Sequence, residues 1–204
     1  MNKHWTITRK KFLSMTEIRK LRKTTEDAYL LAEKKGQMLA IRDWMIIDIA
    51  LSTGLRVSEQ SKLKEEDLYL KNNESEIIVV NGKGGKSRMV KIDPSLKRHL
   101  KKYLQWKRSI DKNGNYVFFS DRRDRMCVES FEKVFNKYAK KAELSKDYTF
   151  HSMRHSYATH LYAKTLDLRL VQKQLGHSSP AITQIYADIV LTNLDKAFSS
   201  PLFD

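Results

Sequence analysis

The chain has 204 residues, 41% of them hydrophobic, which suffices for one domain with a substantial core. Its 39 Lys and Arg against 24 Asp and Glu give a formal net charge of +15, which favours a polyanionic partner such as nucleic acid, and its single cysteine excludes an internal disulfide framework. Because the start lacks the apolar segment of a signal peptide and residues 44–51, the longest apolar run, cannot span a bilayer, we expect a soluble cytoplasmic, nucleoid-associated protein.

The first third of the chain has the patterns of helices. Ser14 or Thr16 can cap a helix that runs to Lys35, and glycines follow this helix and the next one, at Gly36 and Gly54. Apolar residues at helical spacing continue through these segments. We therefore expect helices over residues 16–35, 38–53 and 57–63.

The period then changes to that of strands. Residues 76–80 are β-branched, and residues 87–92 alternate apolar and polar side chains. Between them, the glycine-rich and lysine-rich residues 81–86 are typical of a hairpin turn. A third short strand near residues 67–70 would complete a small antiparallel sheet.

The rest of the chain returns to helices. Pro94 can open one helix, and Thr149 can cap the helix that carries His151 and Arg154. The fold class expected is therefore mainly α with a small antiparallel β-sheet, in a single domain over residues 1–204 that begins with a basic arm, residues 1–13. The helices expected in this part cover residues 94–108 and 128–142, a segment that begins at residue 150, and residues 167–175, 180–188 and 192–198.

Several side chains, most of them near the carboxyl end, suit chemistry on a phosphodiester. This chemistry needs a nucleophile, cations around the phosphate oxygens and an acid for the leaving oxygen. Tyr186 can act as the nucleophile, since an aryl oxygen can form a phosphoester. Arg56 and Arg154 can each hold phosphate oxygens with a planar fork. His151 can accept the tyrosine proton, and His177 can donate to a phosphate oxygen. No cysteine or carboxylate stands at ligand spacing beside these histidines, so we expect no metal site.

Lysines at the expected hairpin tip can supply the acid. We assign this role to Lys83, the first lysine of a G-K-G pattern, although Lys86 lies only three residues further on. Lys86 and Arg88 would then contact DNA phosphates. Glu59 follows Arg56 by one turn, and its carboxylate can fix a buried guanidinium or imidazole by hydrogen bonding. His155, next to Arg154, is interpreted as a packing or supporting residue.

Four motifs together resemble the catalytic domain of the tyrosine recombinases, the phage-integrase family. They follow one another in the family's order between residues 53 and 187. They are T-G-L-R-V-S-E around Arg56, G-K-G-G-K-S-R-M-V around Lys83, H-S-M-R-H-S-Y-A-T-H-L around His151 and Arg154, and L-G-H-S-S-P-A-I-T-Q-I-Y around His177 and Tyr186.

This resemblance implies a fold, a reaction and partners. The fold is that of the family's catalytic domain. Tyr186 would attack DNA to form a 3′-phosphotyrosine, with Lys83 as the acid and His151 as the base, and a 5′-hydroxyl from a second duplex would then displace the tyrosine. The resemblance implies no metal, ATP or other cofactor. It also implies a homotetramer on double-stranded DNA, in which the carboxyl-terminal helix and apolar tail, residues 189–204, can pass between subunits.

The sequence departs from the family's usual pattern at its start. Only 55 residues precede Arg56, whereas typical members carry a separate helical DNA-binding domain there. We expect no such core-binding domain in this chain, which would make it either a minimal recombinase, similar to the short fimbrial-switch invertases, or a catalytic fragment. Two alternatives remain: relaxation of DNA by a type IB topoisomerase-like enzyme, and a non-catalytic DNA-binding remnant of an integrase. The G-K-G and L-G-H-S-S motifs favour the recombinase.

Overall fold

Helices dominate the computed structural model, which describes residues 11–35, 38–80, 87–112, 114–120, 125–177 and 183–188. Residues 183–188 are also helical, and the sheet is antiparallel, so the predicted fold class is confirmed. The elements are α1 (Met15–Lys35), α2 (Met38–Thr53), α3 (Val57–Ser61), the 3-10 helix η2 (Glu65–Asp67), β1 (Leu68–Tyr69), β2 (Glu76–Val80), β3 (Ser87–Lys91), α4 (Pro94–Ser109), α5 (Val128–Lys141), α6 (Phe150–Thr165) and α7 (Leu168–Leu175).

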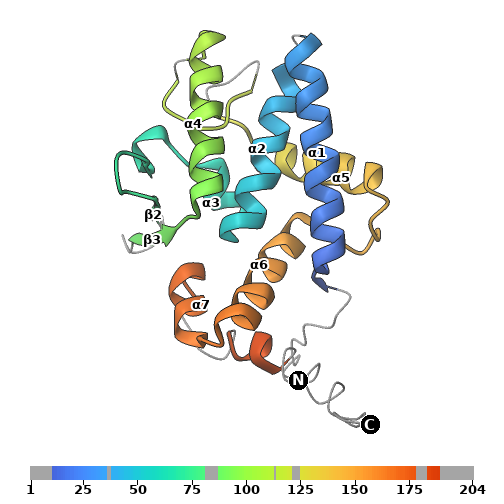
Figure 1. Ribbon diagram of the computed structural model, residues 1–204, viewed down its shortest axis with the longest axis vertical. Helices are drawn as coiled ribbons and strands as arrows, with labels where there is room; N and C mark the ends of the chain where they lie inside the picture. The colour runs from blue at the N-terminus through green and yellow to red at the C-terminus, as the bar shows by residue number, and fades with distance from the viewer. Residues whose placement is uncertain are drawn as a thin grey trace.

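Helix α2 is the centre of the domain. It contacts α1, α4, α5 and α6, and Figure 1 shows it between α1 and α4, with α6 and α7 at one end of the molecule. A helix with apolar residues around most of its circumference is stable only when other elements surround it. Residues 44–47 and 49–51 of α2 are all at least 93% buried, which explains this position.

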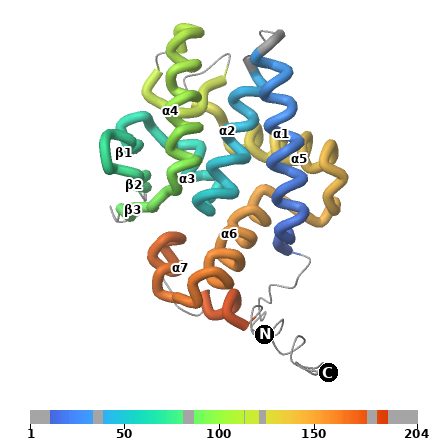
Figure 2. The backbone as a smooth tube through the Cα atoms, in the orientation of Figure 1, coloured from blue at the N-terminus to red at the C-terminus, as the bar shows by residue number. Residues whose placement is uncertain are grey.

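The sheet lies beside this helical core. Its strands are ordered β1, β2, β3, and both pairs are antiparallel, with Ile77 opposite Leu68 on one side and Val90 on the other. Ile77 and Val90 are fully buried, so one face of the sheet packs on the core. Strand β3 also contacts α7, and Figure 2 shows the two elements next to each other. The expected hairpin tip, residues 81–86, lies outside the described residues.

The start of α1 is tied to α6. Ser14 and Glu17 form a reciprocal cap: the Ser14 amide donates to Glu17 Oε2 at 2.8 Å, and the Glu17 amide donates to Ser14 Oγ at 3.3 Å. The Leu13 amide donates to Ser156 Oγ at 2.8 Å, and Leu13 is fully buried. Of the two predicted caps, the structure therefore selects Ser14. Residues 1–10 of the predicted arm and the predicted helix over residues 192–198 lie outside the described residues.

Candidate active site

A single carboxylate, that of Glu59 in α3, organises a group of arginines. Its Oε1 accepts hydrogen bonds from Arg56 Nη1 at 2.8 Å and Arg88 Nη1 at 2.9 Å. Its Oε2 accepts from Arg88 Nη2 at 2.8 Å and from the Arg56 backbone amide at 2.9 Å. Arg154 Nη1 lies 3.9 Å from the same oxygen. These four residues are called the arginine cluster below.

The arginine cluster keeps Glu59 ionised. Burial alone raises the pKa of this carboxyl group, but hydrogen bonds and positive charge from Arg88, followed by hydrogen bonds from Arg56, outweigh burial and hold the pKa at about 2. Three guanidinium groups therefore surround one carboxylate, and the cluster keeps a net positive charge. Such a site attracts an anion, and the planar guanidinium fork matches the geometry of phosphate oxygens.

Arg154, on α6, joins the ends of two other helices. Its Nη1 donates to the Gly54 carbonyl oxygen at 2.7 Å, and its Nη2 donates to the Leu175 carbonyl oxygen at 2.8 Å. Gly54 follows α2 and Leu175 ends α7, so the cation satisfies carbonyls at two helix C-termini. Burial, and then the charge of Arg56, lowers the pKa of Arg154 to about 10, so it remains a cation at neutral pH.

Gly54 must be a glycine for this arrangement to form. Its φ is +62°, in the left-handed region that disfavours other residues. A Cβ at this position would also lie only 2.6 Å from Cδ1 of Tyr157 and 2.9 Å from Cδ2 of Leu175. The helix-ending glycine expected from the sequence therefore also lets α2, α6 and α7 approach closely around Arg154.

His177 and Tyr186 lie together beside the arginine cluster. Their rings are stacked at 6.1 Å with an interplanar angle of 13°, and His177 Nδ1 is 3.0 Å from Thr183 Oγ1. Burial, followed by the charge of Arg154, lowers the pKa of His177 to about 4. Burial raises the pKa of Tyr186 to about 12, and only 1% of the residue is exposed. In this structure the tyrosine is neutral and shielded from solvent.

The hydroxyl group of Tyr186 contacts His155, which the sequence interpretation gave a packing or supporting place. His155 Nδ1 lies 3.0 Å from the hydroxyl oxygen, and both residues are buried. His151 is exposed and meets His155 edge-on, at 4.6 Å between ring centroids. The structure therefore places His155, and not His151, at the hydroxyl. The four-residue spacing puts both histidines on one face of α6, and this signal could have identified His155.

Loss of hydration and nearby positive charge favour the neutral form of three histidines at this site, namely His151, His155 and His177. Burial, followed by the charges of His151 and Arg154, lowers the pKa of His155 to about 3. Loss of hydration, followed by the charges of Arg154 and Arg56, lowers the pKa of His151 below its ordinary value. A neutral imidazole can accept a proton, so either histidine can serve a tyrosine that must lose one.

These shifts predict that acid destabilises the protein already below pH 6.5. Above that pH, His155 and His177 are mostly neutral in both the folded and the unfolded state. Below it, the unfolded chain binds protons that these two buried residues exclude until about pH 3 and 4. Stability should therefore fall by up to about 1.4 kcal/mol per pH unit for each such histidine. Urea denaturation at pH 7 and pH 5 measures this loss. The His155→Asn variant, which cannot titrate, should lose less, and equal losses would contradict the explanation.

Arg88 faces the protein interior, which differs from the prediction that it contacts DNA phosphates. Its side chain is 9% exposed, all three of its donor nitrogens are engaged, and they bind Glu59 and the Gln174 carbonyl oxygen. Three of its five N–H groups are thus used inside the protein, and little of the side chain is accessible to a phosphate. Lys83 and Lys86 lie outside the described residues. The other predicted site residues come together: Arg56, Glu59, His151, Arg154, His177 and Tyr186.

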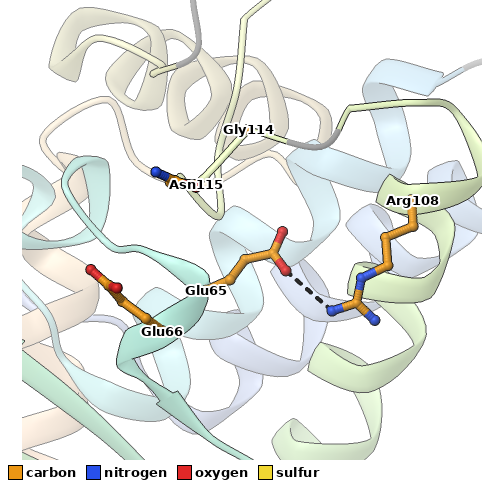
Figure 3. A pocket seen from close by; sticks show the side chains of 5 residues that line it. All are labelled: Glu65, Glu66, Arg108, Gly114 and Asn115. Carbon is orange, nitrogen blue, oxygen red and sulfur yellow. Dashed lines mark hydrogen bonds and ion pairs between the residues drawn. The ribbon is translucent and has the colours of Figure 1, made fainter.

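A pocket elsewhere on the surface is less suited to a phosphate than the arginine cluster is. It has a volume of about 160 Å³ and is lined by Glu65, Glu66, Arg108, Gly114 and Asn115. Figure 3 shows Glu65 paired with Arg108, and their Oε2 and Nη2 atoms are 3.2 Å apart. Its two carboxylates disfavour an anion, and none of the predicted site residues lines it. Among the described residues, no group of three or more His, Cys, Asp or Glu is arranged to hold a metal ion, and no helix is long and apolar enough to cross a membrane.

The helical fold and this cluster define a tyrosine recombinase catalytic domain, the class of the solved structures that the chain resembles. The sequence model of the phage integrase family matches residues 11–191, so the chain belongs to that family. It is 34% identical to the tyrosine recombinase XerC of Thermodesulfovibrio yellowstonii, covering 88% of this chain and 62% of that protein. It is 36% identical to XerA of Pyrococcus horikoshii, covering 77% of this chain and 54% of that protein.

Solved structures of recombinases also resemble this chain. The crystal structure of XerA recombinase matches with a TM-score of 0.77 at 30% identity, covering 98% of this chain and 66% of that one. The XerH recombinase bound to its difH substrate, before cleavage, matches with a TM-score of 0.73 at 28% identity, covering 87% of this chain and 50% of that one. The chain thus spans between half and two thirds of the length of these relatives.

Proposed function

We propose that the protein is a site-specific DNA recombinase that cuts and rejoins DNA strands through a 3′-phosphotyrosine on Tyr186. The observation that carries the proposal is the arginine cluster, which holds Arg56 and Arg154 on one carboxylate beside His177 and Tyr186. The relatives that are named tyrosine recombinases favour this activity over DNA relaxation or binding without cleavage.

In the first step, Arg56, Arg154 and His177 bind the non-bridging oxygens of the scissile phosphate and stabilise the charge that develops on them. The Tyr186 oxygen attacks phosphorus while its proton passes to His151. The bond from phosphorus to the 5′ oxygen breaks, and Lys83 gives that oxygen a proton. Because Tyr186 is 1% exposed and its hydroxyl contacts His155, attack requires the tyrosine to leave this contact.

In the second step, a 5′-hydroxyl from another duplex attacks the phosphotyrosine and releases Tyr186, which takes back a proton. Neither a metal nor ATP is consumed, because the phosphotyrosine keeps the energy of the cleaved bond. The likeness to XerH bound to a difH substrate and the net charge of +15 support double-stranded DNA as the partner. We infer that the described residues form one catalytic domain, that it acts as a tetramer at the nucleoid, and that residues 189–204 pass between subunits.

Covalent capture tests the proposal without knowledge of the target site. A pool of randomised duplexes that carry a nick in each strand is incubated with the protein in EDTA and then denatured with detergent. Cleavage beside a nick releases a short fragment, so the reaction cannot reverse, and the expected product is a protein–DNA adduct whose sequence gives the target. Binding of the pool without any adduct would overturn the proposal. A two-site recombination assay on the captured sequence, beside plasmid relaxation, separates a recombinase from a topoisomerase.

Replacing Lys83 by alanine is expected to slow cleavage by about 10²-fold to 10⁴-fold, the usual contribution of a positioned general acid. A 5′-phosphorothiolate substrate, whose sulfur leaves without a proton, should restore the rate of this variant. The measurement is the rate of adduct formation on both substrates, with Lys86→Ala as the matched control. Rescue of Lys86→Ala in place of Lys83→Ala would assign the acid to Lys86.

A further inference from the structure

Arg88 connects three elements that surround the arginine cluster. It lies on β3, its Nη1 and Nη2 donate to both oxygens of Glu59 on α3, and its Nε donates to the Gln174 carbonyl oxygen at 3.0 Å. Gln174 belongs to the last turn of α7, and its side-chain Oε1 accepts from the Lys91 amide of β3 at 3.2 Å. One guanidinium thus bridges the sheet, the helix that bears Glu59 and the end of α7.

The two hydrogen bonds from Arg88 to Glu59 also leave Arg56 available to bind a phosphate. The Glu59 side chain is 7% exposed, and a buried carboxylate that loses its partner is strongly unfavourable. Arg88 satisfies one lone pair on each oxygen of this carboxylate, whereas Arg56 gives it one side-chain hydrogen bond and keeps 39% of its side chain exposed. Without Arg88, the carboxylate would draw Arg56 inward, away from a phosphate.

The turn that carries His177 is shaped around Arg88. Gly176 has a φ of +64°, and a Cβ there would lie 2.6 Å from Cδ of Arg88 and 3.0 Å from its Nε. The glycine of the L-G-H-S-S motif therefore leaves room for the Arg88 side chain as well as adopting a left-handed turn. The residues on either side of this glycine are Leu175, whose carbonyl binds Arg154, and His177.

We propose that Arg88 is a positioning residue, which holds Glu59 and the end of α7 so that Arg56, Arg154 and His177 face one phosphate. This inference rests on the proposed function for its catalytic consequence, whereas its structural part concerns the protein alone. It replaces the direct phosphate contact that the sequence suggested for Arg88. The two roles differ in what they change: a positioning residue alters the rate of chemistry, and a phosphate contact alters DNA affinity.

Arg88→Met and Arg88→Lys test the inference on the captured duplex, with Lys91→Gln as the control. Lys91 is on the same strand, and its side chain is 73% exposed and pairs with Glu76 outside the arginine cluster. Adduct formation at saturating DNA should slow by about 10²-fold in Arg88→Met, as when reacting groups are misplaced by about 1 Å. Arg88→Lys, which keeps the charge but not the fork, should slow about 10-fold. Lys91→Gln should keep the wild-type rate.

DNA affinity decides between the two roles. Positioning predicts that Arg88→Lys and Arg88→Met keep the wild-type affinity within about two-fold and the same dependence on salt. A phosphate contact predicts that Arg88→Met binds DNA more weakly and that the slope of log affinity against log salt concentration falls by about one in magnitude. It also predicts an unchanged rate of adduct formation at saturating DNA. This result would overturn the inference.

A double variant tests whether Arg88 acts through Glu59. Combining Glu59→Gln with Arg88→Met should be no slower than the slower single variant, and additive losses would also count against the inference.

Histidine titration by NMR tests the structural part even if the wild type forms no adduct. Arg88→Lys keeps the positive charge near His177 but removes the fork that shapes its turn. The His177 signal should shift and titrate closer to pH 6.5, because the loosened turn admits water. An unchanged His177 titration in folded Arg88→Lys would overturn the positioning role. Absence of an adduct with the wild type would instead reject the proposed function.

Discussion

Replacing Arg154 by alanine is expected to slow adduct formation by about 10³-fold and to lower the free energy of unfolding by about 3 kcal/mol. The rate falls because one of the cations at the developing phosphate charge is lost. Stability falls because the carbonyl oxygens of Gly54 and Leu175 lose the donors that they accept from at 2.7 and 2.8 Å. Adduct rates at saturating DNA and urea denaturation measure the two effects.

Two further variants make this result specific. Arg154→Lys keeps a cation but cannot reach both carbonyls with one planar fork. We therefore expect this variant to retain part of the wild-type stability but little of the wild-type rate of adduct formation. Arg98→Ala removes an exposed arginine from α4 and should match the wild type in stability within about 0.5 kcal/mol. If Arg154→Ala were as stable and as fast as Arg98→Ala, neither the structural nor the catalytic role of Arg154 could stand.

The Tyr186→Phe variant should form no adduct while it keeps its fold and its DNA affinity. Phenylalanine retains the ring that stacks on His177 and loses only the hydroxyl that contacts His155. We therefore expect the free energy of unfolding to fall by no more than about 1–2 kcal/mol. Adduct yield, DNA binding and urea denaturation are measured on the same preparation.

Tyr162→Phe is the matched control, because Tyr162 packs in the same small apolar cluster as Tyr186. It should form adducts at the wild-type rate. A wild-type yield from Tyr186→Phe would mean that another residue attacks the DNA. A loss in both variants would point to damaged packing of this cluster, and the nucleophile would then need to be identified by other means.

Much of the fold could be predicted because local signals and tertiary packing agree. Ser14 caps α1, the glycine at position 54 follows α2, and Pro94 begins α4, as the sequence predicts. The strand patterns of residues 76–80 and 87–92 match β2 and β3, although β3 ends at Lys91. The short elements differ more: β1 covers only Leu68–Tyr69, α3 ends at Ser61, and the 3-10 helix η2 was not predicted.

The candidate site was predictable where a motif carries the chemistry, as with Arg56, Arg154 and Tyr186. It was not predictable where a side chain's partner lies on a distant element. Arg88 is two residues before the buried Val90 on β3, so the strand period places both on the same face of the sheet. The sequence does not show that this face brings Arg88 to Glu59 of α3 and to the end of α7. His155 likewise acquires its place only when residues 183–188 bring Tyr186 to α6.

Mapping the attachment site of DNA on the protein tests the central claim most directly. The wild-type adduct formed in EDTA is digested with nuclease and trypsin, and the modified peptide is fragmented in a mass spectrometer. Cleavage after Lys173 and Lys196 gives a peptide that contains Tyr186 as its single tyrosine. The account predicts a nucleotide joined through phosphate to Tyr186. A nucleotide on any other residue, or an adduct that forms only when a divalent metal is supplied, would contradict it.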